Sequence, residues 1–366
     1  MHEPTAIPTT RGEGTRSQSA VWEHALDLVR AAVDRSQPAY GLELLGEQIR
    51  RERGVPAVPG LEYAQQLTTI RVLVAEDLLR RVRAAYDGQI VLIKGLEVAL
   101  RYPDPGLRPF GDLDLLVPDT GAAQRALLDA GFEEVMDPDL FLDIHQERPL
   151  ALPGSPLMIE LHKWPKWPDF LDPPPLEGLL AVAVDSRSGV AGIQALPDAQ
   201  HAVVVAAHAW THGPLNHPRQ LLDVAVLAEG IPRAKLRRLA AQWDLDRIWE
   251  TTIRCADSLF GDAPHTAAER LWARHLRAVR ERTVAEAHLE KYLSPLWAYS
   301  LPMAVQVSAS MLRAELRPAQ DETWREKGRR TLVALRNSAT PRSRHDEALG
   351  PEAEKRRKPG RFTRTG

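Results

Sequence analysis

The chain has 366 residues, a formal net charge of −2 and a sequence pI near 6.7. This length indicates two or three domains, because one domain usually takes roughly 100–200 residues. Hydrophobic residues make up 44% and charged residues 26%, which is typical of globular proteins and excludes bulk disorder. The near-neutral charge lacks the basic excess of most nucleic-acid-binding proteins. The single cysteine, Cys255, excludes an internal disulfide framework and is interpreted as a small core residue.

The first part of the chain predicts a tail followed by helices. Residues 1–20 are polar, rich in Thr, Ser, Gly and Pro, and carry no hydrophobic stretch of the signal-peptide kind. No apolar run approaches the roughly 18–20 residues that a transmembrane helix needs. We therefore expect a cytoplasmic, bacterial-type protein without a membrane partner. Residues 21–85 form a predicted N-terminal helical region, whose last helix has an apolar stripe made of Leu67, Ile70, Val74, Leu78 and Val82.

Residues 86–195 change in character and predict a small core of strands and helices. Short apolar runs, each bounded by a turn signal or a proline, predict strands at 89–93, 112–117 and 157–162. Asp119 or Thr120 begins a predicted helix that ends at Ala130, and a shorter one follows Gly95. The expected fold class is mixed α+β, with a small mixed sheet flanked by helical regions before and after it.

The rest of the chain is predicted to be helical and then unstructured. A segment rich in Trp and Pro follows Lys163, and helical spacing of apolar residues returns over 196–316. Residues 317–366 are polar and basic, with a run of charges at 355–358, so we expect a flexible tail there.

Two aspartates on one predicted strand indicate a metal site. Asp112 and Asp114 are two residues apart, so their side chains share a face of the strand, while Leu113 and Leu115 occupy the other face. Adjacent carboxylates repel each other unless a cation lies between them, and Mg²⁺ prefers oxygen ligands. Glu160 and His162 share a face of the strand at 157–162. If that strand lies beside the first, Glu160 becomes a third carboxylate.

Three carboxylates can hold two Mg²⁺ ions about 4 Å apart, with Mn²⁺ as the alternative metal. Such a pair positions a triphosphate, activates an attacking hydroxyl and stabilises a pyrophosphate leaving group. Lys94 and Gly95 end the preceding strand and bring a cation and a flexible backbone near the phosphates. Arg108 is a second candidate phosphate contact, because its planar guanidinium suits phosphate oxygens.

The motifs at 92–95 and 100–117 together resemble an uncharacterised bacterial nucleotidyltransferase family of the DNA polymerase beta-type superfamily. The likeness extends through Ile159-Glu-Leu-His162 and into the segments at 208–212 and 221–224, and covers roughly residues 22–230. It implies that Asp112 and Asp114 are the paired metal-binding aspartates and Glu160 the third carboxylate. Lys94-Gly95 falls at the phosphate turn of the superfamily, although Leu96 replaces its second small residue.

The resemblance implies transfer of a nucleoside monophosphate from an NTP to an acceptor, with release of pyrophosphate. The near-neutral composition favours a small molecule, a sugar or a peptide as acceptor over a long nucleic acid. Two alternatives stay open. One is a non-catalytic nucleotide- or partner-binding module on the same fold, favoured by the altered turn at Leu96. The other is an Asp-x-Asp glycosyltransferase that releases a nucleoside diphosphate.

Histidines and tryptophans supply further candidates for the lining of the cleft. His201, His208 and His212 share one face of a predicted helix, a spacing that also suits zinc. No Glu follows His208 as a His-Glu-x-x-His zinc site requires, so we interpret these histidines as a polar stripe facing the cleft. The candidates for lining the cleft are His162, Trp164, His208 and His212.

Overall fold

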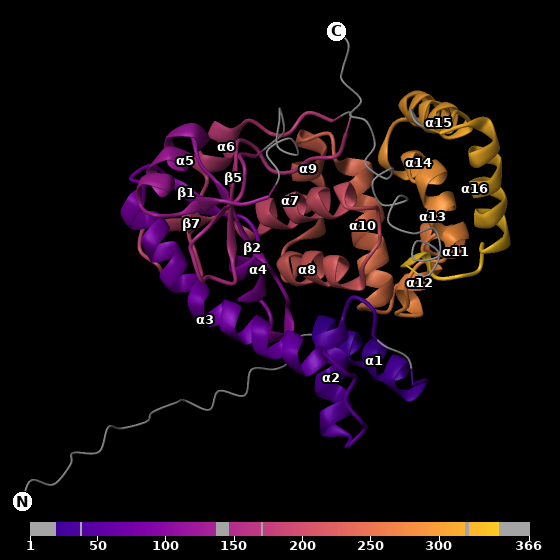
Figure 1. The fold of residues 1–366 in the computed structure, drawn as a ribbon, viewed down its shortest axis with the longest axis horizontal. Helices are drawn as coiled ribbons and strands as arrows, with labels where there is room; N and C mark the ends of the chain where they lie inside the picture. The colour runs from indigo at the N-terminus through magenta and orange to yellow at the C-terminus, as the bar shows by residue number, and fades with distance from the viewer. Residues whose placement is uncertain (1–19, 37–38, 137–145, 170, 319–321, 344–366) are drawn as a thin grey trace, which may run out of the picture.

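The computed structural model describes residues 20–36, 39–136, 146–169, 171–318 and 322–343. It contains a seven-stranded mixed sheet with the strand order β3-β4-β5-β2-β1-β7-β6, which lies on one side of the molecule (Figure 1). The strands are β1 (Ile90–Leu92), β2 (Asp112–Leu116), β3 (Glu133–Glu134), β4 (Leu150–Ala151), β5 (Met158–His162), β6 (Val184–Asp185) and β7 (Ile193–Ala195). Helices precede and follow the sheet along the chain, which confirms the predicted mixed α+β fold.

The three predicted strands are β1, β2 and β5, each one or two residues shorter than predicted. β2 runs antiparallel to β1 and parallel to β5. In the β2–β5 pair Asp114 lies opposite Glu160, and Leu116 lies opposite His162. The expectation that the strand of Glu160 lies beside the strand of the two aspartates is therefore confirmed.

The outer strands of the sheet are not predicted by the sequence. β7 pairs with β1 in parallel, and β6 pairs antiparallel with β7. β3 and β4 extend the sheet beyond β5. Each of these four strands has only two or three residues, which is too short for an alternating pattern to be recognised.

Helix α3 (Leu61–Ala85) covers the sheet with only part of the predicted stripe. Leu78 and Val82 are buried together with Ala75 in the core of the sheet, whereas Ile70 is 48% exposed. The buried residues of α3 lie mainly in its second half, so the stripe predicted for the first half is wrong at Ile70. The reason is that α3 extends well beyond the sheet, toward α2 (Figure 1).

Helix α5 (Thr120–Asp129) has the start that the sequence predicts. The carboxylate of Asp119 accepts a hydrogen bond of 2.8 Å from the backbone N–H of Ala122, which satisfies one of the free donors of the first turn. Gly131 follows the helix with a φ of 88°, a conformation that favours glycine.

Helix α7 (Asp198–Thr211) lies between the sheet and α10 (Asp246–Leu259) (Figure 1). Eleven of its 14 residues are buried, because it packs against α8 (Pro218–Ala228), α9 (Arg233–Gln242) and α10 as well as lying against the sheet. A helix that is apolar on nearly all sides belongs in a core, and α7 is the centre of the larger of two hydrophobic clusters.

Shorter and outer helices complete the described chain. They are α1 (Ala20–Asp34), α2 (Glu43–Glu52), α4 (Leu96–Ala99), the 3₁₀ helix η1 (Pro105–Leu107), α6 (Leu176–Ala181), α11 (Ala267–Leu271), α12 (Arg274–Arg277), α13 (Val284–Leu293), α14 (Pro295–Ala298), α15 (Leu301–Leu316) and α16 (Trp324–Arg336). Within the described ranges, no helix combines the length and apolarity needed to cross a bilayer. Cys255 is buried in α10, as expected of a core residue.

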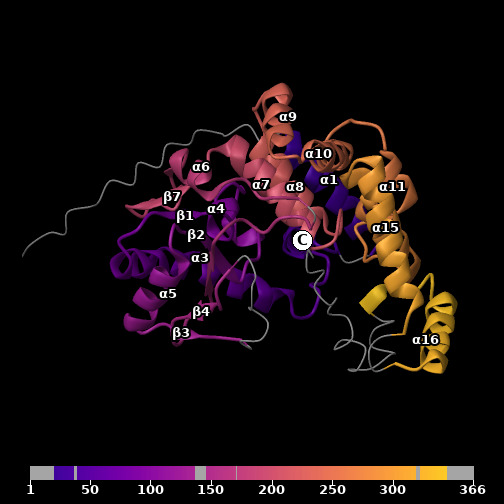
Figure 2. The ribbon, with the colours of Figure 1, turned by 90° about the horizontal axis from the view of Figure 1, so that it is seen from above.

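The prediction of a flexible tail from residue 317 is wrong for α16. This helix begins with a capping box formed by Thr323 and Glu326. Lys327 forms an ion pair of 2.7 Å with Glu315 of α15, so the basic residues here hold two helices together. α15 and α16 lie at the end of the molecule remote from the sheet (Figures 1 and 2). The predicted tails at 1–19 and 344–366 lie outside the described residues.

We expect Thr323→Ala to weaken α16, because the substitution removes the side chain that caps its first turn. Loss of such a cap costs about 1 kcal/mol, which corresponds to about a fivefold loss of amide protection within 324–336. Hydrogen exchange read by mass spectrometry measures this loss, and α5 serves as the internal control. If the amides at 324–336 are unprotected in the wild type, then α16 is not formed in solution.

Candidate active site

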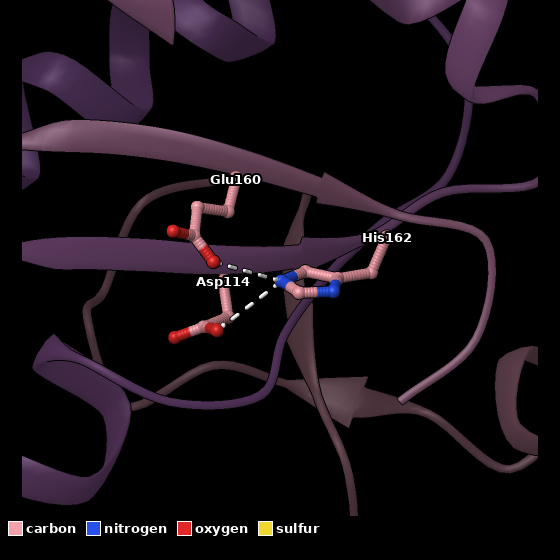
Figure 3. Close-up of side chains that lie close together, drawn as sticks. All are labelled: Asp114, Glu160 and His162. Carbon is pink, nitrogen blue, oxygen red and sulfur yellow. Dashed lines mark hydrogen bonds and ion pairs between the residues drawn. The ribbon is translucent and has the colours of Figure 1, made fainter. Parts of the chain in front are cut away.

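The pairing of β2 with β5 brings three predicted site residues together. Asp114 of β2 lies opposite Glu160 of β5, and His162 follows on the same face of β5. The His162 Nε2 atom lies 3.2 Å from Asp114 Oδ1 and 3.5 Å from Glu160 Oε2 (Figure 3). His162, predicted only to line a cleft, is therefore in direct contact with both carboxylates.

Asp114 is a buried carboxylate with one unsatisfied oxygen. It is 1% exposed, and its Oδ2 atom has no hydrogen-bond partner among the described residues. Burial alone would raise the pKa of Asp114, but the positive charges of Lys94 and His162 hold that pKa well below its usual value. Asp114 is therefore ionised at neutral pH and presents a bare oxygen.

Asp112, two residues before Asp114 on β2, is a weaker acid than Asp114. Burial, together with the negative charge of Asp114, raises the pKa of the Asp112 carboxyl to about 6. The strand register places Met158 opposite Asp112, whereas Glu160 lies opposite Asp114. For this reason the group of close ligand atoms consists of Asp114, Glu160 and His162, and the role of Asp112 as a metal ligand stays a prediction.

The donor set of the group fits a divalent cation. One ligand atom each from Asp114, Glu160 and His162 lies within 4.8 Å of the others. Two carboxylate oxygens suit a hard cation such as Mg²⁺ or Mn²⁺, and imidazole adds a nitrogen that transition metals accept. The unsatisfied Oδ2 of buried Asp114 supports the same interpretation, because a buried oxygen without a donor is costly unless a ligand binds it.

Two lysines and two histidines surround the carboxylates. Lys94, which follows β1, places its Nζ 2.8 Å from Nε2 of His208 on α7. Lys166 places its Nζ 3.0 Å from Nε2 of His212, the residue that follows α7. Lys94 acts electrostatically on Asp112 and Asp114, and the same carboxylates act on Lys166. The site therefore combines carboxylates with two ammonium groups, of which the sequence analysis identified only Lys94.

His208 and His212 are neutral imidazoles that hold these lysines in place. Burial and the charge of Lys94 bring the pKa of His208 well below its usual value. Burial and the charge of Lys166 lower the pKa of His212 to about 4. Neutral imidazoles accept hydrogen bonds, so Lys94 donates to His208 and Lys166 donates to His212. The predicted polar stripe thus faces the site at these two positions.

His201 is the exception among the predicted histidines. It is fully buried, and its Nε2 atom lies 2.6 Å from the backbone oxygen of Ile93, to which it donates. Burial lowers the pKa of His201 to about 4, so the ring is neutral. This hydrogen bond joins α7 to the end of β1, and the ring of His201 has no contact with solvent.

Gly95 is required by packing at the predicted phosphate turn. Its φ is 61°, and a Cβ atom at this position would come within 2.4 Å of the backbone oxygen of Asp112. A side chain here would therefore push the first aspartate of β2 out of place. A glycine is therefore needed at position 95 because β2 passes so close to it. The contact of Gly95 with phosphate stays a prediction.

The prediction that Arg108 contacts phosphate does not agree with the structure. Arg108 is 3% exposed, and its Nε and Nη2 atoms donate to the two carboxylate oxygens of Asp223 on α8 at 2.8 and 2.9 Å. The hydroxyl of Tyr102 donates to the same carboxylate, and Arg108 Nη1 donates to the backbone oxygen of Gly95. The guanidinium is thus committed to joining the Gly95 turn to the helical layer.

Trp164 keeps its place as a candidate. It is 38% exposed, two residues beyond His162. Trp167, by contrast, is buried and packs edge-on against Trp243 with ring centroids 6.1 Å apart. Of these two tryptophans, Trp164 is therefore the one with an exposed surface, and its role in lining the cleft stays a prediction.

We expect Asp223→Ala to destabilise the fold strongly, because it leaves the buried guanidinium of Arg108 without its partner. Loss of one partner of a buried ion pair costs about 3–5 kcal/mol. Thermal unfolding measures the change, and Asp77→Ala, which breaks an exposed ion pair with Arg81, is the matched control with little effect. A change in melting temperature equal to that of the control would show that the Arg108–Asp223 pair does not hold the layers together.

Comparison with known proteins identifies the family of this chain. A search of curated proteins gives no significant match. Among solved structures, the chain is similar to the antibiotic-resistance factor ANT(2'')-Ia, with 15% sequence identity, a TM-score of 0.34, and coverage of 46% of this chain and 91% of that one. A family model described as "Uncharacterised nucleotidyltransferase" matches residues 42–261, which contain the whole sheet, α7, α8 and every site residue described above. The chain therefore belongs to this family of uncharacterised nucleotidyltransferases.

Proposed function

We propose that this protein transfers a nucleoside monophosphate from an NTP to an acceptor hydroxyl or amine and releases pyrophosphate. The observation that carries the proposal is the strand register that sets Asp114 opposite Glu160, with Lys94 on the neighbouring segment. Family membership supports the same class of reaction and argues against the Asp-x-Asp glycosyltransferase considered from the sequence.

The carboxylates would bind the metal, and one of them would accept the proton of the acceptor group. Asp114 and Glu160, with Asp112 beside them, would hold Mg²⁺ or Mn²⁺. When bound, such a metal neutralises phosphate charge and stabilises the leaving group. The Glu160 side chain is 18% exposed, compared with 2% for Asp114, so Glu160 is the carboxylate that an acceptor can reach. In this proposal Glu160 receives the proton of the attacking group.

The ammonium groups have the role of binding the triphosphate. Lys94 donates to neutral His208 on α7 and Lys166 donates to neutral His212 just after α7, so each Nζ has a fixed position. A triphosphate brings several negative charges into a site that already contains carboxylates, and two lysines offset part of this repulsion. The acceptor is proposed to be a small molecule, a sugar or a peptide, because the chain lacks a basic excess.

We expect isothermal titration of the four NTPs to give binding only with Mg²⁺ or Mn²⁺ present. Asp114→Asn keeps the shape of the side chain but removes its charge, so we expect affinity to fall about 100-fold, or about 2.7 kcal/mol. Asp129→Asn, an exposed carboxylate on α5, is the matched control. The proposal fails if the folded wild type binds no NTP, or if Asp114→Asn binds as tightly as the wild type.

Turnover separates the transferase from a non-catalytic binding module. We expect Lys94→Met and Lys166→Met each to raise the Kd for NTP by about tenfold to 100-fold, since each removes a charged contact to phosphate. Lys235→Met, an exposed lysine of α9, is the control. Pyrophosphate release, screened against candidate acceptors, reports the transfer itself. NTP binding with wild-type affinity in both site variants would remove the lysines from the proposed site.

A further inference from the structure

The ring of His162 points its Nε2 atom between two carboxylates. The ring is 1% exposed and lies within a hydrogen-bond distance of Asp114 Oδ1, with Glu160 Oε2 slightly further away (Figure 3). These three side chains come from two adjacent strands in fixed register, so the arrangement is set by the sheet and not by a loop. A rigid sheet is a precise support for ligand atoms.

The separations match those between neighbouring ligands of one metal ion. Two ligands at right angles around a cation, each about 2.1 Å from it, lie about 3.0 Å apart. The Nε2–Oδ1 distance is 3.2 Å and the Nε2–Oε2 distance is 3.5 Å. One cation can therefore contact all three atoms after only a small adjustment of the side chains.

A second observation points to a ligand at this place. Asp114 is 1% exposed, yet its Oδ2 atom accepts no hydrogen bond within the described part of the chain. Its Oδ1 atom faces His162. An anionic oxygen that is buried and lacks a donor costs stability unless a cation binds there.

We propose that His162 is a direct nitrogen ligand of the metal held by Asp114 and Glu160, and that the site therefore prefers Mn²⁺ to Mg²⁺. This inference rests on the proposed function, which gives the metal its role, but the test uses Mn²⁺ alone and needs no nucleotide. Mg²⁺ strongly prefers oxygen ligands, whereas first-row transition metals accept imidazole readily. One nitrogen and two carboxylates leave further coordination positions for phosphate oxygens.

The direct test is the magnetic signature of Mn²⁺ added to the wild-type protein. Pulsed electron paramagnetic resonance detects the coupling between Mn²⁺ and a bound ¹⁴N nucleus, and ¹⁵N-histidine labelling changes that coupling in a known way. We expect a nitrogen coupling that shifts on labelling. Bound Mn²⁺ without any nitrogen coupling would overturn the proposal and leave His162 as a hydrogen-bond donor to Asp114.

Affinity measurements on variants provide the second test. We expect His162→Gln to weaken Mn²⁺ binding by at least about tenfold while Mg²⁺ binding changes much less. His24→Gln, which removes a partly exposed imidazole on α1, is the matched control. Equal losses for both metals, or no loss of Mn²⁺ affinity, would contradict a nitrogen ligand. A nitrogen coupling without NTP binding would refute the proposed function alone, and NTP binding without the coupling would refute this inference alone.

Discussion

The buried charge of Asp114 is the constraint on which the rest of the site depends. A carboxylate that is almost fully excluded from water remains ionised only where positive charge compensates it, and here Lys94 and His162 supply that charge. Lys94 needs a fixed position for this purpose, and His208 of α7 provides it. The ionised aspartate thus requires a lysine after β1, an imidazole on β5 and a neutral imidazole on a helix more than 90 residues later in the sequence.

The site is consequently a joint product of the sheet and the helical layer. His201 binds the backbone at the end of β1, His208 binds Lys94, and Asp223 binds Arg108, which itself holds the backbone of Gly95. The contacts of His201, His208 and Asp223 all cross the boundary between residues 195 and 196, where the sequence predicts that the core ends and the helical domain begins. Buried polar contacts of this kind fix position as much as they stabilise, because each buried group has a specific partner to satisfy.

The sequence predicted what depends on local spacing. The i, i+2 aspartates, the alternation through Glu160 and the turn signals or prolines that bound the strands are local features, and they were sufficient for the three central strands β1, β2 and β5. The adjacency of the carboxylates was only a condition in the sequence, and the pairing of β2 with β5 meets it. Contacts between distant residues were not predictable. Nothing near Arg108 indicates Asp223, so its guanidinium was interpreted as free for phosphate. Composition misled at α16, because basic residues that suggested a tail are paired with Glu315 and Glu322.

The burial of α7 has a consequence for any attempt to shorten the protein. A helix that is buried along 11 of its 14 residues presents apolar surface toward both the sheet and α8 to α10. A fragment that ends after β7 would expose the face of the sheet that α7 covers, and would leave Lys94 without His208. We therefore expect that the smallest fragment able to fold alone contains α7 together with the sheet.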